Sequence, residues 1–178
     1  MTTLRTPTLT LRPPGADDAV PIAGHLSDFG VAGNLARVPH PYSLKDAQNW
    51  LAGCRARPPA SDTAFMIEDG EGRVAGNVGF HERHPGVADI GYYLGRPFWG
   101  NGMMTDAVRV ALDWYFAKSG ADRVGSGVFH FNAASLAIQH KLGFVETGRS
   151  MVFCEARNQT IEHIDTELTR STYLALDR

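Results

Sequence analysis

The feature that most constrains the fold is a strand pattern that runs through a glycine-containing loop into the longest helical stretch of the chain. Residues 88–94 have the pattern of a β-strand, Gly100 and Gly102 follow in the loop, and residues 100–119 carry a helical period. The apolar residues of that helix form one stripe, made of Met104, Ala107, Val108, Ala111 and Tyr115. A strand, a loop and a helix in this order indicate an α/β fold.

The rest of the chain supplies further strands and helices. Strand patterns cover 8–12, 63–68, 73–82, 123–131, 144–153 and 161–169, and helical patterns cover 16–27, 43–56 and 132–142. Residues 30–41 are predicted as a loop, 57–59 as the end of the second helix, and 84–86 as a turn. The resulting order, β-α-α-β-β-β-α-β-α-β-β, predicts a mixed α/β fold with a largely antiparallel sheet.

Length and composition exclude several classes of protein. A chain of 178 residues suits a single domain, 1–178, and a net charge of −2 gives no support for bulk capture of nucleic acid or of an anionic membrane. No apolar run exceeds four residues, and the first residues lack the apolar core of a signal peptide. Cys54 and Cys154 are expected to be free thiols in a reducing cytoplasm, and no His or Cys spacing resembles a zinc site.

The loop before the long helix is a candidate phosphate site. A helix N-terminus carries unpaired N–H groups and partial positive charge, and glycines let the backbone approach a ligand. An ordinary connection from loop to helix explains the spacing of Gly100 and Gly102 equally well. Thr105 stands where a GxGxxG motif needs its third glycine, and no GxxxxGK[ST] motif is present. Two other GxG pairs occur, at 70/72 in a predicted hairpin turn and at 125/127 in a strand.

Asn132 and Ser135 lie three residues apart at the start of a predicted helix, so both can face one side. Asn is a favoured N-cap residue. From the residues alone, a capping Asn132 and an ordinary first-turn Ser135 are therefore the preferred interpretation.

Two segments resemble the GNAT family of N-acetyltransferases, and most of all its RimJ/RimL-like branch. The segment 89–94 with 99–107 resembles the family's acetyl-CoA loop, and Asn132 to Ser135 followed by 141–144 resembles a second segment of that branch. Trp99 stands where the wider family has Gln or Arg, and Met104 where it has a small residue. The resemblance implies the GNAT fold: a twisted sheet of about seven strands that splays between the fourth (88–94) and the fifth (123–131), flanked by about four helices.

The resemblance also implies an acetyl-CoA site. Its residues would be Tyr93, Leu94, Trp99, Gly100, Asn101, Gly102, Met103, Met104, Thr105, Asn132 and Ser135. The pantetheine arm would pair with backbone of Tyr93 and Leu94, the pyrophosphate would bind the N–H groups of residues 100–105, and Ser135 would protonate the leaving thiolate. Asp89 is the first candidate base and Glu82 the second, although a solvated strand-end residue is the plainer interpretation of each.

The implied activity is a direct, acetyl-CoA-dependent acetylation of a primary amine in the cytoplasm, with no metal. The acceptor would be a protein N-terminus, an amino acid or a small-molecule amine, and the resemblance implies a homodimer. An α-amine is roughly a tenth neutral at pH 7 and a lysine amine well under a thousandth, so a lysine needs a base more. A non-catalytic acyl-CoA-binding module and a protein that binds another nucleotide through residues 100–105 are the alternatives.

Overall fold

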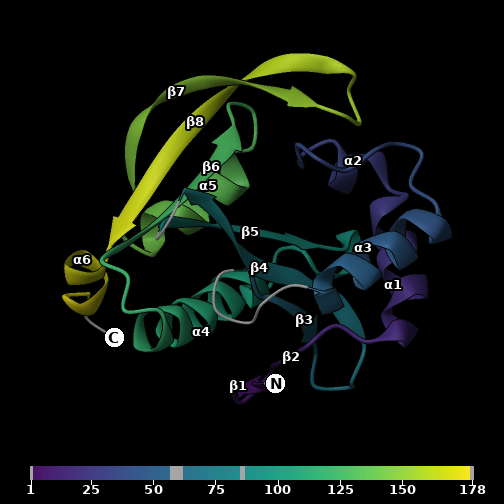
Figure 1. The fold of residues 1–178 in the computed structure, drawn as a ribbon, viewed down its shortest axis with the longest axis horizontal. Helices are drawn as coiled ribbons and strands as arrows, with labels where there is room; N and C mark the ends of the chain where they lie inside the picture. The colour runs from purple at the N-terminus through teal and green to yellow at the C-terminus, as the bar shows by residue number, and fades with distance from the viewer. Residues whose placement is uncertain (1, 57–61, 85–86, 177–178) are drawn as a thin grey trace.

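The computed structural model of the chain describes residues 2–56, 62–84 and 87–176. Within these ranges eight strands form one sheet in the order β1-β2-β3-β4-β5-β6-β8-β7 (Figure 1). The strands are β1 Leu4–Arg5, β2 Thr10–Arg12, β3 Ala64–Glu68, β4 Val74–His84, β5 Val87–Leu94, β6 Arg123–Phe129, β7 Val145–Cys154 and β8 Gln159–Thr169. Among the described strands, β5 and β6 are the only parallel pair, which confirms the largely antiparallel sheet. The additional strand is the two-residue β1.

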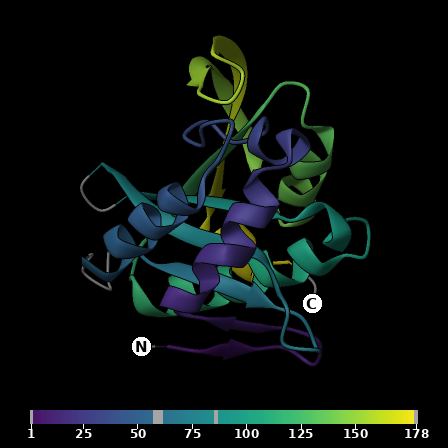
Figure 2. The same cartoon turned by 90° about the vertical axis from the view of Figure 1, so that its right-hand side faces the viewer.

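Helices cover both faces of the sheet. In the described ranges α1 Ala19–Leu26, α2 Phe29–Ala32 and α3 Leu44–Ala56 lie on one side, and α4 Met103–Lys118, α5 Ala133–Lys141 and α6 Arg170–Leu174 on the other. Figure 2 shows α1 and α3 in front of the strands. We call the two sides the α1–α3 face and the α4 face. Short 3₁₀ turns, η1 Ala16–Asp18 and η2 Arg96–Phe98, precede α1 and α4.

The larger core lies between the sheet and the α4 face. The predicted apolar stripe of α4 is buried there along its whole length, together with Phe80 of β4 and Tyr173 of α6. The rings of Phe80 and Tyr115 stack with centroids 4.4 Å apart. This packing positions the first turn of α4 at the end of β5, because the helix is anchored to the strands over four turns.

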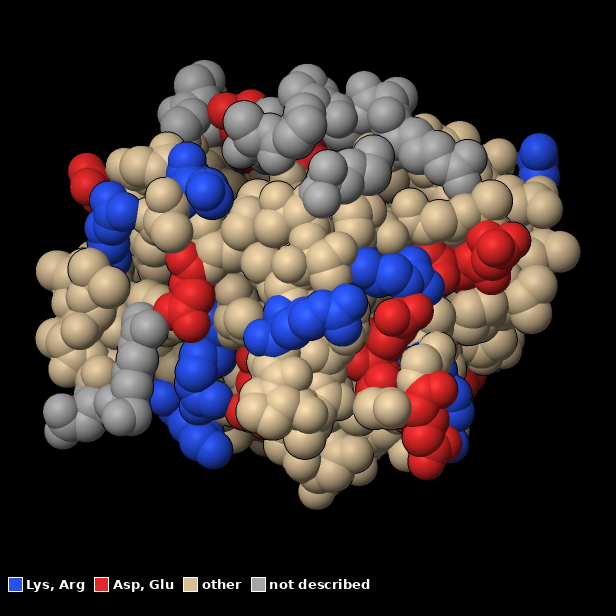
Figure 3. All heavy atoms as spheres, turned by 90° about the horizontal axis from the view of Figure 1, so that it is seen from below, with Lys and Arg blue, Asp and Glu red and all other residues tan. Residues whose placement is uncertain are grey.

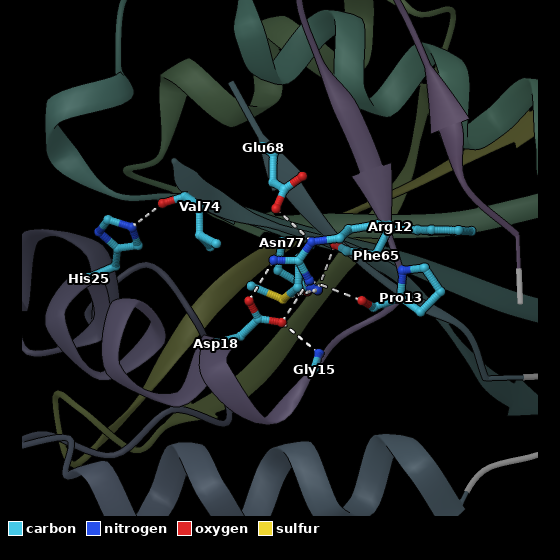
Figure 4. Close-up of polar contacts among 10 residues, drawn as sticks. Arg12, Pro13, Gly15, Asp18, His25, Phe65, Glu68, Val74 and Asn77 are labelled. Atoms are coloured by element: carbon cyan, nitrogen blue, oxygen red, sulfur yellow. Dashed lines mark hydrogen bonds and ion pairs between the residues drawn. The ribbon is translucent and has the colours of Figure 1, made fainter. Parts of the chain in front are cut away.

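An ion cluster attaches the start of α1 to the sheet (Figure 4). Arg12 of β2 donates to Glu68 of β3 at 2.6 Å and to both oxygens of Asp18 at 2.7 and 2.9 Å. Asp18 is 2% exposed and also accepts from the backbone N–H of Gly15. Burial by itself would raise the pKa of Asp18, but the hydrogen bonds from Arg12 and Gly15 outweigh it and lower that pKa.

The structure corrects three element predictions. Part of the predicted loop 30–41 belongs to α2, which starts where the side chain of Asp28 accepts from Gly30 N–H. The long helix begins at Met103 rather than at residue 100, since both glycines before it have left-handed backbone. The short C-terminal α6 was not predicted. The expected helix end at 57–59, and residues 85–86 of the predicted turn, lie outside the described residues.

The described helices and the charges on one face bear on contact with a membrane. In the described part of the chain, no helix combines the length and apolarity needed to cross a bilayer. Figure 3 shows Lys and Arg interleaved with Asp and Glu on the face seen from below. On that face the charge distribution matches the near-neutral balance of the sequence.

Candidate active site

The centre of the site is a gap between β5 and β6. These two strands share a single registered pair, Asp89 with Gly125, whereas β5 pairs with β4 from Val87 to Leu94. Just past that pair, the carbonyl of Ile90 accepts a hydrogen bond from the side-chain hydroxyl of Ser126 at 2.9 Å. The gap therefore opens toward the C-terminal ends of both strands. It lies between the fourth and fifth predicted strands, as the family resemblance implies.

A buried polar network holds the two edges of the gap. Gln139 of α5 donates through Nε2 to Ser126 Oγ at 2.9 Å and accepts through Oε1 from Thr166 of β8 at 2.7 Å. Gln139 is 1% exposed, and Ser126 and Thr166 are buried as well. Because every polar atom of Gln139 has a partner, the network can be buried without an unpaired group. It connects β5, β6, β8 and α5 at the place where the sheet divides.

The loop before α4 has the backbone geometry of an anion site. Gly100 and Gly102 both have φ of +80°, a conformation that side-chain-bearing residues rarely adopt. A Cβ at either glycine would meet nothing within 4 Å, so the backbone here is open to a ligand. The side chain of Asn101 accepts from Met103 N–H at 3.1 Å, and the remaining first-turn N–H groups carry the positive end of the helix dipole.

The two residues of the loop that depart from the family pattern have structural roles. Met104 is 6% exposed and packs into the core of the α4 face. Trp99 donates its indole N–H to the carbonyl of Leu94 at 2.8 Å, and the Arg96 guanidinium lies over the Trp99 ring at 5.0 Å. A ligand pairing with β5 would therefore share the Leu94 carbonyl with Trp99.

Arg96 connects this loop to the α1–α3 face. Its guanidinium donates to both carboxylate oxygens of Asp28, at 2.5 and 2.9 Å. The hydrogen bond from Arg96 lowers the pKa of Asp28 to about 2. Next to it, His25 of α1 bonds the carbonyl of Val74 at 2.8 Å, and its ring occupies the space that a side chain at Gly95 would need.

Ser135 meets a tyrosine across the gap. Its hydroxyl donates to the hydroxyl of Tyr92 on β5 at 3.0 Å, and burial raises the pKa of Tyr92. The side chain of Asn132 accepts from Ser135 N–H at 3.2 Å and caps α5. The capping interpretation of Asn132 is thus confirmed, while its contact with a cofactor stays a prediction. The sequence alone contains no signal that connects Tyr92 with Ser135.

The two predicted carboxylates are not brought together. Asp89 lies on the α1–α3 face, the opposite face from Tyr92, where His81 of β4 is its registered neighbour. Its Oδ1 is buried against Gly125 and has no hydrogen-bond partner in the described ranges, and its Oδ2 is 3.7 Å from Arg83. Glu82 pairs in register with Ala88, which places it on the α4 face, and it is exposed.

One cleft of about 1400 Å³ connects these features. It is lined from both layers of helices and from β4 to β8, and every predicted site residue except Met103 contributes to it. A single small ligand usually occupies roughly 300–1,000 Å³, so the cleft has room for two substrates. Two lining residues of β8, His163 and Asp165, were not predicted; the only sequence signal near them is the glycine pair 125/127 of the neighbouring strand.

Neither cysteine lines the cleft, and neither forms a disulfide within the described residues. Cys154 is buried with its Sγ 3.6 Å from the carbonyl oxygen of Leu35. Within the described ranges, no group of three or more His, Cys, Asp or Glu side chains could hold a metal ion.

Comparison with known proteins gives consistent matches. The family described as "Acetyltransferase (GNAT) domain" matches residues 8–145. An uncharacterized N-acetyltransferase, p20 of Bacillus licheniformis, is 26% identical over 97% of this chain and 99% of its own. The structure of a ribosomal-protein-S5-alanine acetyltransferase from Vibrio fischeri superposes with a TM-score of 0.82 at 21% identity, covering 97% of this chain and 99% of that one. The structure of a spermidine N-acetyltransferase from Vibrio cholerae, in complex with CoA and spermine, superposes with a TM-score of 0.79 at 20% identity. This match covers 93% of this chain and 98% of that one.

Proposed function

The chain belongs to the GNAT acetyltransferase family, whose donor is acetyl-CoA, and from this premise we propose where its two substrates bind and which residues act on them. It is an N-acetyltransferase that transfers an acetyl group to an amine. The observation that carries the proposal is the glycine loop at the start of α4, beside a gap that Tyr92 and Ser135 span. The whole of 1–178 is proposed to be one such domain.

Acetyl-CoA would enter the gap from the α4 face. Its pyrophosphate would bind the N–H groups of residues 100–105, with the hydroxyl of Thr105 as a further donor. Its pantetheine arm would run along β5 at Tyr93 and Leu94, with Trp99 at the side and Asn132 opposite. The open backbone at both glycines and the inward packing of Met104 support this placement.

Ser135 is proposed to protonate the thiolate that leaves. The Tyr92 hydroxyl orients the serine hydroxyl across the gap, so the donor group is held where the two strands part. Attack by the amine forms the C–N bond, and the C–S bond breaks with its electron pair going to sulfur. When Ser135 turns its O–H from Tyr92 to the sulfur, this proton makes the sulfur a better leaving group, and the Tyr92 O–H can donate to the serine oxygen in its place.

The acceptor is proposed to be a primary amine that enters from the α1–α3 face. The V. fischeri neighbour is named for a ribosomal protein and the V. cholerae neighbour for spermidine, so both a protein N-terminus and a small amine are candidates. Asp89 is on this face and Glu82 is not, which supports ranking Asp89 above Glu82 as an acceptor-side carboxylate. We propose a cytoplasmic location on the basis of the sequence alone.

We also propose a homodimer. β7 is the last strand in the sheet order, and it exposes Val145, Met151 and Phe153. An exposed apolar edge strand is a surface that natural proteins usually cover. Light scattering at working concentration would test this, and a monomer would contradict it.

Acetyl-CoA binding and turnover test the function directly. Purified protein is expected to be stabilised thermally by acetyl-CoA and CoA but not by ATP, and to consume acetyl-CoA with at least one amine from a panel of peptides, amino acids and polyamines. Ser135→Ala should lower kcat by roughly 10²-fold while leaving acetyl-CoA affinity within about twofold.

The matched control is Ser27→Ala, which loses a 2.8 Å hydroxyl hydrogen bond to Gly24 outside the cleft. That variant should turn over as the wild type does. Stabilisation by ATP alone would contradict the donor site, and full turnover by Ser135→Ala would contradict the role of Ser135.

A further inference from the structure

The glycine pair of β6 has no role in the donor site, yet the structure requires glycine at both positions. A Cβ at Gly125 would collide with the Asp89 carboxylate, and a Cβ at Gly127 would collide with the imidazole of His163. Gly125 and Gly127 point the same way from the strand, toward the α1–α3 face. The two glycines thus make room for a carboxylate and an imidazole on one side of the sheet.

His163 is held in a defined orientation. Its Nδ1 lies 2.8 Å from Oδ1 of Asp165, and the same oxygen accepts from the hydroxyl of Ser150 at 2.8 Å. An ionised carboxylate only accepts hydrogen bonds, so Nδ1 is the donor and Nε2 of the neutral ring keeps its lone pair. In the described part of the chain, Nε2 has no hydrogen-bond partner. The ring is therefore ready to accept a proton at Nε2.

The pair is also on the acceptor side of the gap. His163 is in register with Phe129 and Asp165 with Gly127, and β6 borders the gap from Gly125 onward. The side chains of His163 and Asp165 are 20% and 21% exposed and line the cleft. These residues lie on the α1–α3 face, whereas α4 and α5 cover the other.

Three strands supply the groups that contact His163 and its partner Asp165. From β8 it faces Asp165, from β7 Ser150, and from β6 the ring of Phe129 at 5.7 Å. On the far side of the gap, Asp89 of β5 lies on the same face. The Asp89 carboxylate is itself 3.7 Å from Arg83, so Asp165 is the charged group in direct contact with the imidazole.

We propose that His163 is the general base that accepts a proton from the acceptor ammonium, and that Asp165 is its positioning residue. This rests on the proposed function. The ammonium gives one proton to Nε2, and the neutral amine forms the C–N bond with the thioester carbon. The C–S bond breaks, the sulfur takes up a proton equal to the second one lost by nitrogen, and His163 later releases its proton to solvent.

The contribution of the base to the rate should be larger for a more basic acceptor amine. A side-chain-type amine with a pKa of about 10.4 is almost entirely protonated at pH 7, whereas an α-amine with a pKa of about 8 is partly neutral. Removal of the base should therefore hurt the more basic amine more. The loss of activity should also become smaller as the pH rises, because the amine then loses its proton to solvent without the base.

The test compares His163→Gln and Asp165→Asn with the wild type, using acetyl-CoA with spermine and with a short peptide that has a free N-terminus. His163→Gln is expected to lower kcat/KM for the more basic amine by roughly 10²-fold at pH 7 and by much less at pH 9.5. Asp165→Asn should cost roughly 10-fold. The matched control is His130→Gln, an exposed histidine outside the cleft, which should be unchanged.

Acetyl-CoA affinity, measured by calorimetry, should stay within about twofold in all three variants. Unchanged turnover in His163→Gln would overturn the inference, and so would an equal loss at both pH values, or a loss of acetyl-CoA affinity in step with activity. Wild-type protein that fails to bind acetyl-CoA, or that binds it and acetylates no amine, would overturn the proposed function itself.

Discussion

The two faces of the sheet are built in different ways. On the α4 face, the proposed donor site comes from two continuous stretches, 90–105 and 132–144, in which one loop and two helix starts supply nearly every group. On the α1–α3 face, the polar groups beside the gap come one at a time from different strands: Asp89 from β5, Ser150 from β7, and His163 and Asp165 from β8. The first face depends on local backbone geometry, and the second on strand register.

The largest effect on stability is expected from breaking the ion pair between Arg12 and Asp18 on the α1–α3 face. Arg12→Leu would leave the buried Asp18 carboxylate without its cationic partner, so we expect the free energy of unfolding to fall by about 3 kcal/mol. Urea denaturation at pH 7 measures this, with Arg5→Leu on the exposed first strand as the control. An equal cost for both substitutions would contradict the role of the cluster.

This effect has a pH dependence of definite sign. The pKa of Asp18 is lowered in the folded protein, so its pairing stabilises the fold above the ordinary carboxyl pKa of 3.8. The stabilisation is lost as the pH falls through the folded-state pKa. The difference in the free energy of unfolding between Arg12→Leu and the wild type should therefore be constant near neutral pH. It should become smaller in acid, below about pH 4.

The next effect concerns the backbone of the α4 face. Gly102→Val puts a β-branched residue at φ +80°, so the loop must change shape and its N–H groups turn away from the ligand. We expect acetyl-CoA affinity to fall roughly 100-fold, which is about 2.7 kcal/mol. Calorimetry measures it, and Gly24→Ala in α1, where a Cβ meets nothing within 4 Å, should bind as the wild type does. Retained affinity in Gly102→Val would show that the loop does not hold the donor.

A smaller effect is expected from the network that holds the gap. Gln139→Leu would leave the buried hydroxyl of Thr166 without its acceptor and remove the donor to Ser126, at a cost of about 2 kcal/mol in stability. Gln48→Leu, at an exposed position of α3, should stay within about 0.5 kcal/mol. Similar unfolding midpoints for the two variants would mean that the gap is not held by Gln139.

The smallest effect belongs to the contact that joins the two faces. Asp28→Asn weakens the pairing with Arg96, so Tm at pH 7 should fall by about 1–3 °C, because exposed ion pairs contribute little. The pKa of Asp28 is lowered to about 2, so the wild type keeps this contribution above about pH 4 and loses it toward pH 2. Thermal scans across that pH range should show the difference in Tm between Asp28→Asn and the wild type disappear in acid. The control is Asp17→Asn, at an exposed position. A difference that persists at pH 2 would contradict the ionic origin.

The sequence predicts the strand, loop and helices of the α4 face because the signals that specify these elements are local. A glycine that must adopt positive φ, an Asn that caps a helix and an apolar stripe on α4 each act within a few residues of chain. The same locality explains the errors. The long helix was predicted to begin at residue 100, but it begins at Met103, because the glycines before it have left-handed backbone. The helix α2 was missed because four residues with an Asx cap carry almost no periodic signal.

On the α1–α3 face, the pattern of residues in the sequence was not enough to predict which polar groups lie together beside the gap. His163, Asp165, Ser150 and Asp89 are separated by up to 76 positions, and only hydrogen-bonded register puts them on one face of one sheet. A shift of one residue would turn every one of these side chains to the opposite face. Local backbone chemistry therefore specifies the glycine loop before α4 from the sequence, while strand pairing across the whole fold decides which polar groups lie together on the proposed acceptor side of the gap.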